Sequence, residues 1–226
     1  MGIKAALFDL DGTLLNRDAS VKLFINRQYD RIYELVGHIP KENYMERFIE
    51  LDSRGYVWKD KVYQQLVKEL NIKMAWEDLL EDYIKEFRNH CVPFPHLISM
   101  LEDLKRNNLR LGIITNGYGQ FQMDNVKALG IEMYMDLIFV SEWEGMKKPD
   151  SQIFQRALMK LQLQSEESVF IGDHPDNDVK AAQQVGMKGI WKRDDHWNDV
   201  EADHIVDDLA EVPFVIKELN DTKNYI

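Results

Sequence analysis

Ile3-Lys4-Ala5-Ala6-Leu7-Phe8 leads directly into Asp9-Leu10-Asp11-Gly12-Thr13. The first run is apolar except for one lysine, which predicts a short buried strand. Alternate side chains of an extended chain share a face, so Asp9 and Asp11 start on the same side, and Gly12 allows a sharp turn afterwards. Two carboxylates at a strand end suit a divalent metal or an acid/base pair. A solvated Asp-Gly turn is the alternative, and partners elsewhere in the chain decide between the two.

The composition is that of an acidic globular protein. The chain has 226 residues, of which 45% are hydrophobic and 30% are charged, enough for one large domain or two modest ones. The formal net charge of -11 argues against nucleic acid polymers and anionic membranes as main partners. A small anionic substrate stays compatible with this charge, because lysines and a metal ion reverse the field inside a single cleft.

Cysteine usage and the absence of targeting patterns favour the cytoplasm. Cys91 is the single cysteine, which excludes an intrachain disulfide and indicates a reducing compartment. The sequence shows no secretory signal pattern, and no apolar run approaches the roughly 18 residues of a membrane span. We therefore expect a cytoplasmic protein without a membrane partner, and the oligomeric state is left open.

Residues 18–90 carry apolar side chains at helical spacing and contain no strand-like run. Four amphipathic helices with short joins predict a small helical bundle, with the aromatic residues of the stripes in its core. The four stripes are Val21, Ile25, Tyr29, Ile32 and Val36; Tyr44, Phe48, Ile49 and Leu51; Val62, Tyr63, Leu66, Val67 and Leu70; and Trp76, Leu79, Leu80, Tyr83, Ile84 and Phe87.

After Pro93 and Pro95, which discourage a continuous helix, strands and helices alternate. This alternation predicts an α/β fold with a parallel sheet and helices on both faces, interrupted after its first strand by the helical bundle. We expect strands at 109–115, 137–140, 168–171, 188–191 and 204–206, helices at 97–106, 120–129, 151–161, 176–185 and 212–219, and a frayed tail at 220–226.

Polar side chains follow each of the strands that could flank the first one. Ligands of open α/β sheets bind outside the carboxyl ends of the strands, so these side chains are expected to converge with the opening carboxylates. They are Thr115 and Asn116, with Gly117 next, after 109–114, Lys147 and Lys148 in the loop after 137–140, and Asp173, Asp176, Asn177 and Asp178 after 168–171.

The residue types of this set suit phosphate chemistry. Asp9 can attack phosphorus and form an aspartyl phosphate, while Asp11 can protonate the leaving oxygen and later activate water. The Thr115 hydroxyl and the Asn116 backbone N–H can hold phosphoryl oxygens near a helix start. The positive charge of Lys148 can stabilise the phosphate and the nucleophile.

A cation is expected beside these groups, because two carboxylates and a phosphate dianion repel one another. Asp173 offers a hard oxygen ligand for Mg²⁺. Asp178 can bind the ion through water or orient Lys148.

The chain resembles the haloacid dehalogenase (HAD) superfamily, in the subfamily I that carries a helical C1 cap. The resemblance covers about residues 3–206, with the cap matched in size and helicity. Four segments carry it in order: Asp9-Leu10-Asp11-Gly12-Thr13-Leu14, Ile114-Thr115-Asn116-Gly117, Lys147-Lys148-Pro149-Asp150 and Gly172-Asp173-His174-Pro175-Asp176-Asn177-Asp178.

The resemblance implies a Rossmann-like core from residues 1–15 and 93–226 and a cap from residues 16–92. It implies Asp9 as nucleophile, Asp11 as acid and base, and Thr115 and Lys148 as phosphate holders. It also implies Mg²⁺ held by Asp9, Asp173 and the Asp11 main-chain carbonyl, and we add Asp178 to this metal set.

Substrate recognition is expected in the cap. The segment 51–58 lies between its second and third helices, and Arg54 within it suits pairing with an anion; a plain helix connector is the alternative. His174 is interpreted as a loop residue, with contact to substrate as the other possibility.

The sequence therefore predicts a Mg²⁺-dependent phosphatase acting on a small phosphorylated metabolite through an aspartyl phosphate. Thr115-Asn116-Gly117 with this cap size is similar to relatives that act on nucleoside 5′-monophosphates, and sugar phosphates and other small metabolites stay open. Two alternatives remain: a phosphomutase of the same superfamily, and a non-catalytic partner-binding protein on the same scaffold. A dehalogenase is less favoured, because Asp11 supplies the acid that phosphate chemistry uses.

Overall fold

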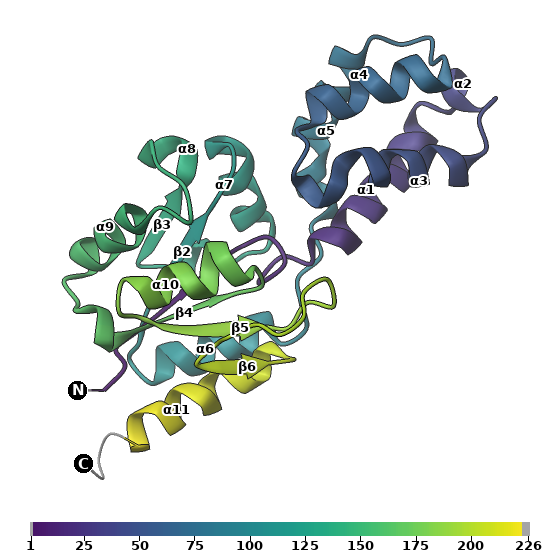
Figure 1. Cartoon of the computed structure of the whole chain (residues 1–226). Helices are drawn as coiled ribbons and strands as arrows, with labels where there is room; N and C mark the ends of the chain where they lie inside the picture. Colours follow the sequence, from purple (N-terminus) through teal and green to yellow (C-terminus); the bar gives the residue numbers. More distant parts are fainter. Residues whose placement is uncertain (1, 223–226) are drawn as a thin grey trace. The chain divides into compact units, whose positions relative to one another are not determined.

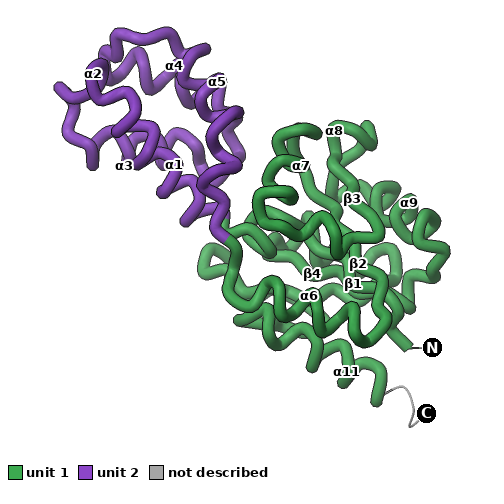
Figure 2. Tube along the Cα trace, turned by 180° about the vertical axis from the view of Figure 1, so that it is seen from behind, with its two compact units in different colours: residues 1–16, 93–226 green, residues 17–92 purple. Residues whose placement is uncertain are grey.

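A computed structural model describes residues 2–222 of the chain, which divides into two compact units. Unit 1 comprises Met1–Asn16 and Pro93–Ile226, and unit 2 comprises Arg17–Val92 (Figure 2). The two segments of unit 1 that flank unit 2 in sequence are paired with each other. Leu15 forms an isolated antiparallel bridge with Pro93, and the Phe94 backbone N–H donates to the Leu14 carbonyl at 3.0 Å.

Unit 1 is built on a six-stranded sheet in which neighbouring strands pair in parallel, which confirms the predicted α/β class. The strand order is β3-β2-β1-β4-β5-β6. The apolar opening run forms β1, which is fully buried between β2 and β4. The strands are β1 (Ala5–Phe8), β2 (Arg110–Thr115), β3 (Leu137–Val140), β4 (Ser168–Gly172), β5 (Lys188–Lys192) and β6 (His204–Val206).

Helices cover both faces of this sheet (Figure 1). α6 (Leu97–Arg106) and α11 (Val212–Thr222) pack together on one face, and α9 (Ser151–Leu161) and α10 (Ala181–Gln184) pack together on the other. The face under α9 and α10 holds a buried apolar cluster that includes Leu7, Ile114, Phe154 and Phe170. The sheet therefore holds β1 rigidly from both sides.

Two expectations for unit 1 need correction. The helix expected at 176–185 is divided into a π-helix, η5 (Pro175–Lys180), and the short α10. The final helix α11 continues to Thr222, past the expected end at 219, so the first part of the tail that was expected to fray is helical. The rest of that tail, 223–226, lies outside the described residues. Further elements of unit 1 are α7 (Gly119–Ala128), α8 (Ser141–Glu144), η3 (Glu132–Tyr134), η4 (Ser165–Glu167) and η6 (Leu209–Glu211).

Unit 2 is an all-helical bundle in which the expected aromatic core is present. Tyr44, Phe48, Tyr63 and Phe87 are each at most 2% exposed. Ile49 and Ile84 of the predicted stripes are instead more than 40% exposed. Its elements are α1 (Arg17–Arg31), α2 (Tyr33–Val36), α3 (Lys41–Asp52), η1 (Ser53–Gly55), α4 (Lys59–Leu70), α5 (Trp76–Glu86) and η2 (Phe87–His90).

The first predicted helix of unit 2 is wrong in one respect. The apolar stripe from Val21 to Val36 suggested one helix, but the chain leaves α1 at Ile32, where φ is -108° and ψ is 20°. The Tyr29 hydroxyl donates to the Ile39 carbonyl at 2.6 Å, so the chain has to turn back within this segment. Val36, which lies beyond the break at Ile32, is still buried. An apolar residue is therefore present at the position where a continuous helix would also place one.

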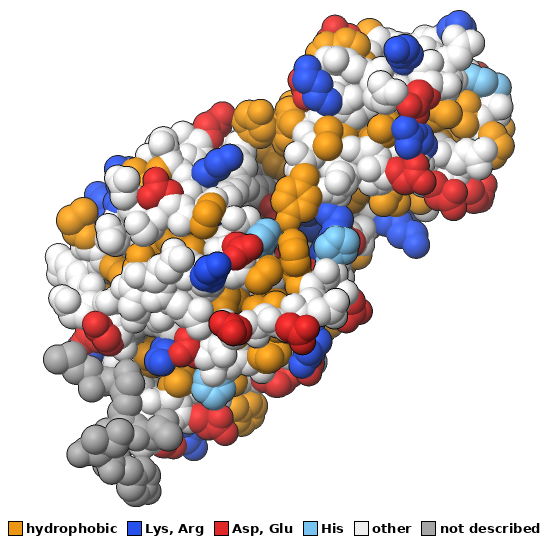
Figure 3. All heavy atoms as spheres, in the orientation of Figure 1, with side chains coloured by type: hydrophobic (Ala, Val, Ile, Leu, Met, Phe, Trp, Pro, Cys, Tyr) orange, Lys and Arg blue, Asp and Glu red, His pale blue; other side chains and the backbone are white. Residues whose placement is uncertain are grey.

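Acidic and basic side chains are interspersed over the face shown in Figure 3, without a basic strip of the kind that tracks nucleic acid. None of the helices within residues 2–222 is both long enough and apolar enough to cross a membrane.

Candidate active site

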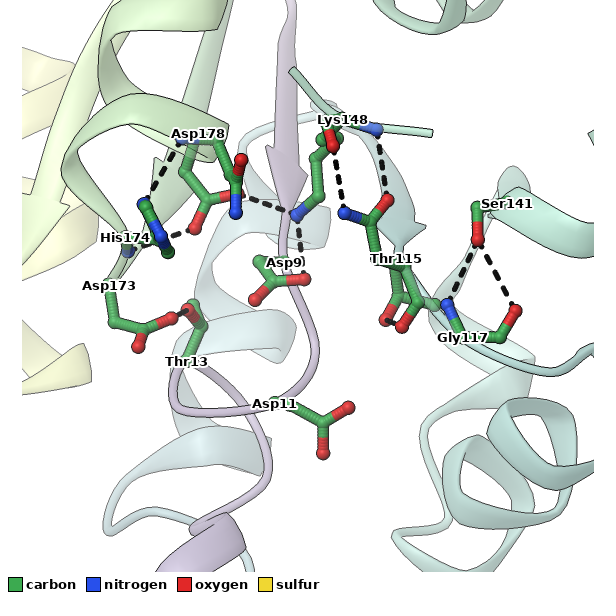
Figure 4. A network of polar contacts seen from close by, with 12 residues as sticks. Asp9, Asp11, Thr13, Thr115, Gly117, Ser141, Lys148, Asp173, His174 and Asp178 are labelled. Carbon is green, nitrogen blue, oxygen red and sulfur yellow. Dashed lines mark hydrogen bonds and ion pairs between the residues drawn. The ribbon is translucent and has the colours of Figure 1, made fainter. Parts of the chain in front are cut away.

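The site lies where three neighbouring strands of unit 1 end. Parallel registry aligns Phe8 of β1 with Ile113 of β2 and Ile171 of β4, so the residues that follow them meet at one edge. Asp9 follows β1 directly, and Thr115 is the last residue of β2. Figure 4 shows the side chains of these strand ends around a common centre.

Three aspartates gather at this edge. One oxygen from each of Asp9, Asp173 and Asp178 lies within 4.8 Å of the others. Gly12 makes room for this cluster, because its φ of +86° favours glycine and a Cβ there would overlap the Asp173 carboxylate. The buried Thr13 hydroxyl donates to Asp173 Oδ1 at 3.3 Å. The turn after β1 therefore shapes the acid cluster as well as ending the strand.

Lys148 lies inside the acid cluster and is 3% exposed. Its Nζ donates to Asp9 Oδ1 at 2.7 Å and to Asp178 Oδ1 at 2.6 Å (Figure 4). The Asn116 side chain holds the lysine backbone, since its Nδ2 donates to the Lys148 carbonyl and its Oδ1 accepts the Lys148 N–H, both at 2.9 Å. Lys147, the neighbouring lysine, is exposed.

Asp178 is fixed through both of its carboxylate oxygens. Oδ1 accepts from Lys148, and Oδ2 accepts the His174 backbone N–H at 3.0 Å. Gly172 lets Asp178 approach the strand, because a Cβ at Gly172 would overlap the aspartate side chain. These bonds suit the second of the two expected roles for Asp178, the orientation of Lys148.

The charges of the cluster shift its pKa values. Burial raises the pKa of Asp9 from 3.8 to about 6, although the charge of Lys148 opposes the rise. Burial, with the charges of Asp9 and Asp178, raises the pKa of Asp173 well above its usual value. Burial alone would lower the pKa of Lys148, but Asp178 and Asp9 more than offset this and raise it. Three carboxylates around one ammonium leave excess negative charge at the site.

The donor set of this cluster fits a hard divalent cation. Its ligand atoms are carboxylate oxygens, which Mg²⁺ prefers. The side chains that could hold the ion are Asp9 and Asp173, and Asp178, whose two carboxylate oxygens are already hydrogen-bonded, lies beside them. The Asp11 side chain is outside this group, and the role of its main-chain carbonyl toward the ion stays a prediction.

Asp11 lies apart from the acid cluster and points away from it (Figure 4). Its carboxylate is half-buried and accepts from Gln122 Nε2 at 2.6 Å. Thr115 is 1% exposed and is bonded to the same amide at 2.8 Å. The loop after Thr115 is bonded to α8, because the Gly117 N–H donates to Ser141 Oγ at 2.9 Å.

Some contributors were not anticipated from the sequence. Gln122 and Asn125 are buried amides on the inner face of α7. The sequence offered one sign of them: two amide residues, three positions apart, lie on the face of this helix where apolar side chains are expected. His174, expected as a loop residue, caps η5: its Nδ1 accepts the backbone N–H groups of Asp176 and Asn177 at 3.1 and 3.2 Å.

Arg54 belongs to unit 2, in a segment of unusual backbone. Ser53, Arg54 and Gly55 have successive φ values of 45°, 54° and 90°. The Arg54 guanidinium is 30% exposed and lies 3.6 Å from an oxygen of Asp18. Its contact with a substrate stays a prediction.

A family model described as "Haloacid dehalogenase-like hydrolase" matches residues 6–192. Among curated proteins, the chain is 31% identical to a glyceraldehyde 3-phosphate phosphatase of Methanocaldococcus jannaschii, over 96% of this chain and 98% of that protein. It is 27% identical to a phosphoserine phosphatase of Thermus thermophilus, over 84% of this chain and 88% of that one.

Solved structures of HAD-type proteins are also similar to this chain over nearly its full length. A HAD phosphatase from Thermococcus onnurineus aligns with a TM-score of 0.67 and 27% identity, covering 95% of this chain and 98% of that one. A HAD-hydrolase from Bacillus subtilis bound to magnesium aligns with a TM-score of 0.77, covering 96% and 99%; at 22% identity it shows the fold alone.

Proposed function

We propose that this chain, which belongs to the haloacid dehalogenase-like hydrolase family and is a hydrolase of phosphate esters, is a Mg²⁺-dependent phosphatase for a small phosphomonoester. The observation that carries the proposal is the buried cluster in which Lys148 contacts Asp9 and Asp178, with Asp173 beside them. We also propose that residues 16–92 serve as its cap domain and residues 1–15 and 93–226 as its core.

The first step uses the strand-end nucleophile. A carboxylate oxygen of Asp9 forms a bond to phosphorus, the ester P–O bond breaks, and an aspartyl phosphate results. Asp11 gives its proton to the leaving alcohol oxygen. Lys148 and the Thr115 hydroxyl hold phosphoryl oxygens while charge develops on them.

The second step returns the chain to its starting state. Asp11, now a carboxylate, takes a proton from water as the water oxygen attacks the aspartyl phosphate. Phosphate leaves and the Asp9 carboxylate is regenerated. Mg²⁺ bound by Asp9 and Asp173 would supply the positive charge that offsets repulsion between these acids and the phosphate.

We propose a small metabolite with its phosphate on a primary carbon as the substrate. Glyceraldehyde 3-phosphate and phosphoserine, named for two relatives, both carry the phosphate on a terminal CH₂ group. Nucleoside 5′-monophosphates and sugar phosphates esterified at a terminal carbon share this feature.

A phosphate-release panel with Mg²⁺ tests the proposal. It compares primary esters (glyceraldehyde 3-phosphate, phosphoserine, nucleoside 5′-monophosphates) with secondary ones (nucleoside 3′-monophosphates, 2-phosphoglycerate), and Asp9→Asn is the matched inactive control. We expect release from at least one primary ester at a rate well above its secondary counterpart. No release from any ester would refute a phosphatase. Isomerisation of a hexose 1-phosphate without free phosphate would establish a phosphomutase instead.

A further inference from the structure

We propose that Gln122 is a positioning residue whose side-chain amide sets the directions of the Asp11 carboxylate and the Thr115 hydroxyl together. No interaction of Gln122 with substrate is required for this role. The inference rests on the proposed function, because it assigns Asp11 to proton transfer and Thr115 to phosphate binding.

The contacts of one nitrogen carry the proposal. Gln122 Nε2 lies 2.6 Å from Asp11 Oδ2 and 2.8 Å from Thr115 Oγ1. The Asn116 carbonyl lies 3.2 Å from the same nitrogen. Gln122 is 2% exposed, so this amide links the ends of β1 and β2 from within the protein.

The orientation of the amide follows from its charged neighbour. An ionised carboxylate can only accept, so the NH₂ end of Gln122 faces Asp11, and Thr115 beside it. The carbonyl end is bonded as well, because Asn125 Nδ2 donates to Gln122 Oε1 at 3.1 Å, and Asn125 is 1% exposed. Gly117 leaves room for the stem of the side chain, since a Cβ at that position would lie only 2.9 Å from Gln122 Cγ.

This arrangement has a consequence for each partner. Thr115 Oγ1 accepts from the amide, so its own hydrogen is directed to another acceptor. In the structure this acceptor is the Asn116 carbonyl, 3.4 Å away, and a phosphoryl oxygen can take its place. Asp11 Oδ2 is anchored, which fixes the plane of the carboxylate that exchanges the proton. A buried amide is costly unless its polar atoms are bonded, and here both ends of it are.

Leaving-group dependence separates this role from a general loss of structure. Gln122→Met keeps the length of the side chain and removes both N–H donors. An alkyl ester needs Asp11 to protonate a poor leaving group, whereas 4-nitrophenyl phosphate releases a good one. We expect the ratio of kcat/KM for the alkyl ester to kcat/KM for the aryl ester to fall about 10-fold in Gln122→Met. This ratio is independent of the fraction of folded enzyme.

Gln120→Met is the matched control. Gln120 is an exposed residue on the same helix, and its Nε2 also donates to an aspartate, Asp124 Oδ1, at 2.7 Å. We expect the ratio to be unchanged in this variant. An unchanged ratio in Gln122→Met, or an equal fall in both variants, would overturn the role toward Asp11.

Phosphate binding tests the role toward Thr115 without turnover. Titration of inorganic phosphate in the presence of Mg²⁺ should show weaker binding to Gln122→Met, by about 3- to 10-fold, and wild-type affinity for Gln120→Met. Equal affinity in all three proteins would overturn this part of the inference. A wild-type protein that binds phosphate but hydrolyses no ester would refute the proposed function, while the binding comparison would still decide on Gln122.

Discussion

Each unit buries a lysine against aspartate, and the two clusters are opposite in composition. In unit 1, Lys148 donates to two carboxylates, Asp9 and Asp178, with a third acid within 4.8 Å. In unit 2, one carboxylate, Asp52, accepts from two cations, Lys59 and Arg17.

The difference separates the cluster of unit 1, which we propose to be catalytic, from the cluster of Asp52, Lys59 and Arg17, which we call the supporting cluster. The Asp52 carboxylate is 2% exposed and both of its oxygens are bonded, Oδ2 accepting from Arg17 at 2.8 Å. In the acid cluster of unit 1, burial raises the pKa of Asp9 and, together with the charges of Asp9 and Asp178, that of Asp173. Perturbed pKa values of this kind are typical of functional sites.

The largest effect should come from the nucleophile. Asp9→Asn should reduce phosphate release at least about 1,000-fold, because an amide cannot form an aspartyl phosphate. Thermal unfolding should show no loss of stability, since the change removes one of the repelling acids. Activity within 10-fold of wild type would contradict the assigned nucleophile.

The supporting cluster should respond in the opposite way. Asp52→Asn should lower the free energy of unfolding by about 3 kcal/mol, because it leaves the buried Lys59 without its carboxylate. Urea unfolding measures this loss, and the kcat of the remaining folded enzyme should stay near wild type. Asp30→Asn, in the exposed ion pair with Lys41, is the control and should leave the midpoint of urea unfolding unchanged. A similar midpoint in wild type, Asp52→Asn and Asp30→Asn would mean that Asp52 contributes little to stability.

Mg²⁺ should stabilise the protein in a pH-dependent manner. A folded pKa of about 6 at Asp9, above the usual 3.8, favours folding at low pH, and this contribution is lost as pH rises through about 6. Above pH 6 Asp9 is ionised and can bind the cation, so Mg²⁺ should raise Tm more at pH 7.5 than at pH 5. At a Mg²⁺ concentration of 100 times Kd, the free energy of unfolding should rise by about 2.7 kcal/mol. Asp173→Asn should remove most of the gain, and an undiminished gain in that variant would place the ion elsewhere.

The smallest effect is expected at the exposed charge of unit 2. Arg54→Ala should raise KM about 3- to 10-fold with kcat and Tm unchanged, if the guanidinium pairs with an anionic group of the substrate. Arg47→Ala removes another exposed arginine of unit 2, in ion pairs with Glu50 and Glu69, and should leave KM as it is. Equal KM values for both variants would assign Arg54 to the connector alone.

The sequence predicted those parts of the molecule that depend on local periodicity. The bounds of β3, α9 and β6 agree with the expected 137–140, 151–161 and 204–206. The side chains that meet in the acid cluster were also predicted, because they follow the ends of the predicted strands and parallel strands bring their carboxyl ends to one edge.

Features that depend on contacts between distant segments were not predictable in this way. The break at Ile32 accompanies a hydrogen bond between Tyr29 and Ile39, a contact that apolar spacing cannot reveal. The link from Gln122 to Asp11 spans 111 residues and joins side chains whose order in the sequence carries no signal. The same holds for Arg17 and Asp52, which are 35 residues apart.

The bridge between Leu15 and Pro93 makes the helical unit an exchangeable module. Its entry and exit are already held together by the sheet unit, so the entropy of closing this loop depends only weakly on the length of the inserted chain. Inserts of different size or shape can therefore occupy residues 17–92 without disturbing the strand ends that hold the acids. If the insert serves as the cap, as proposed, specificity can diversify there while the chemistry stays constant.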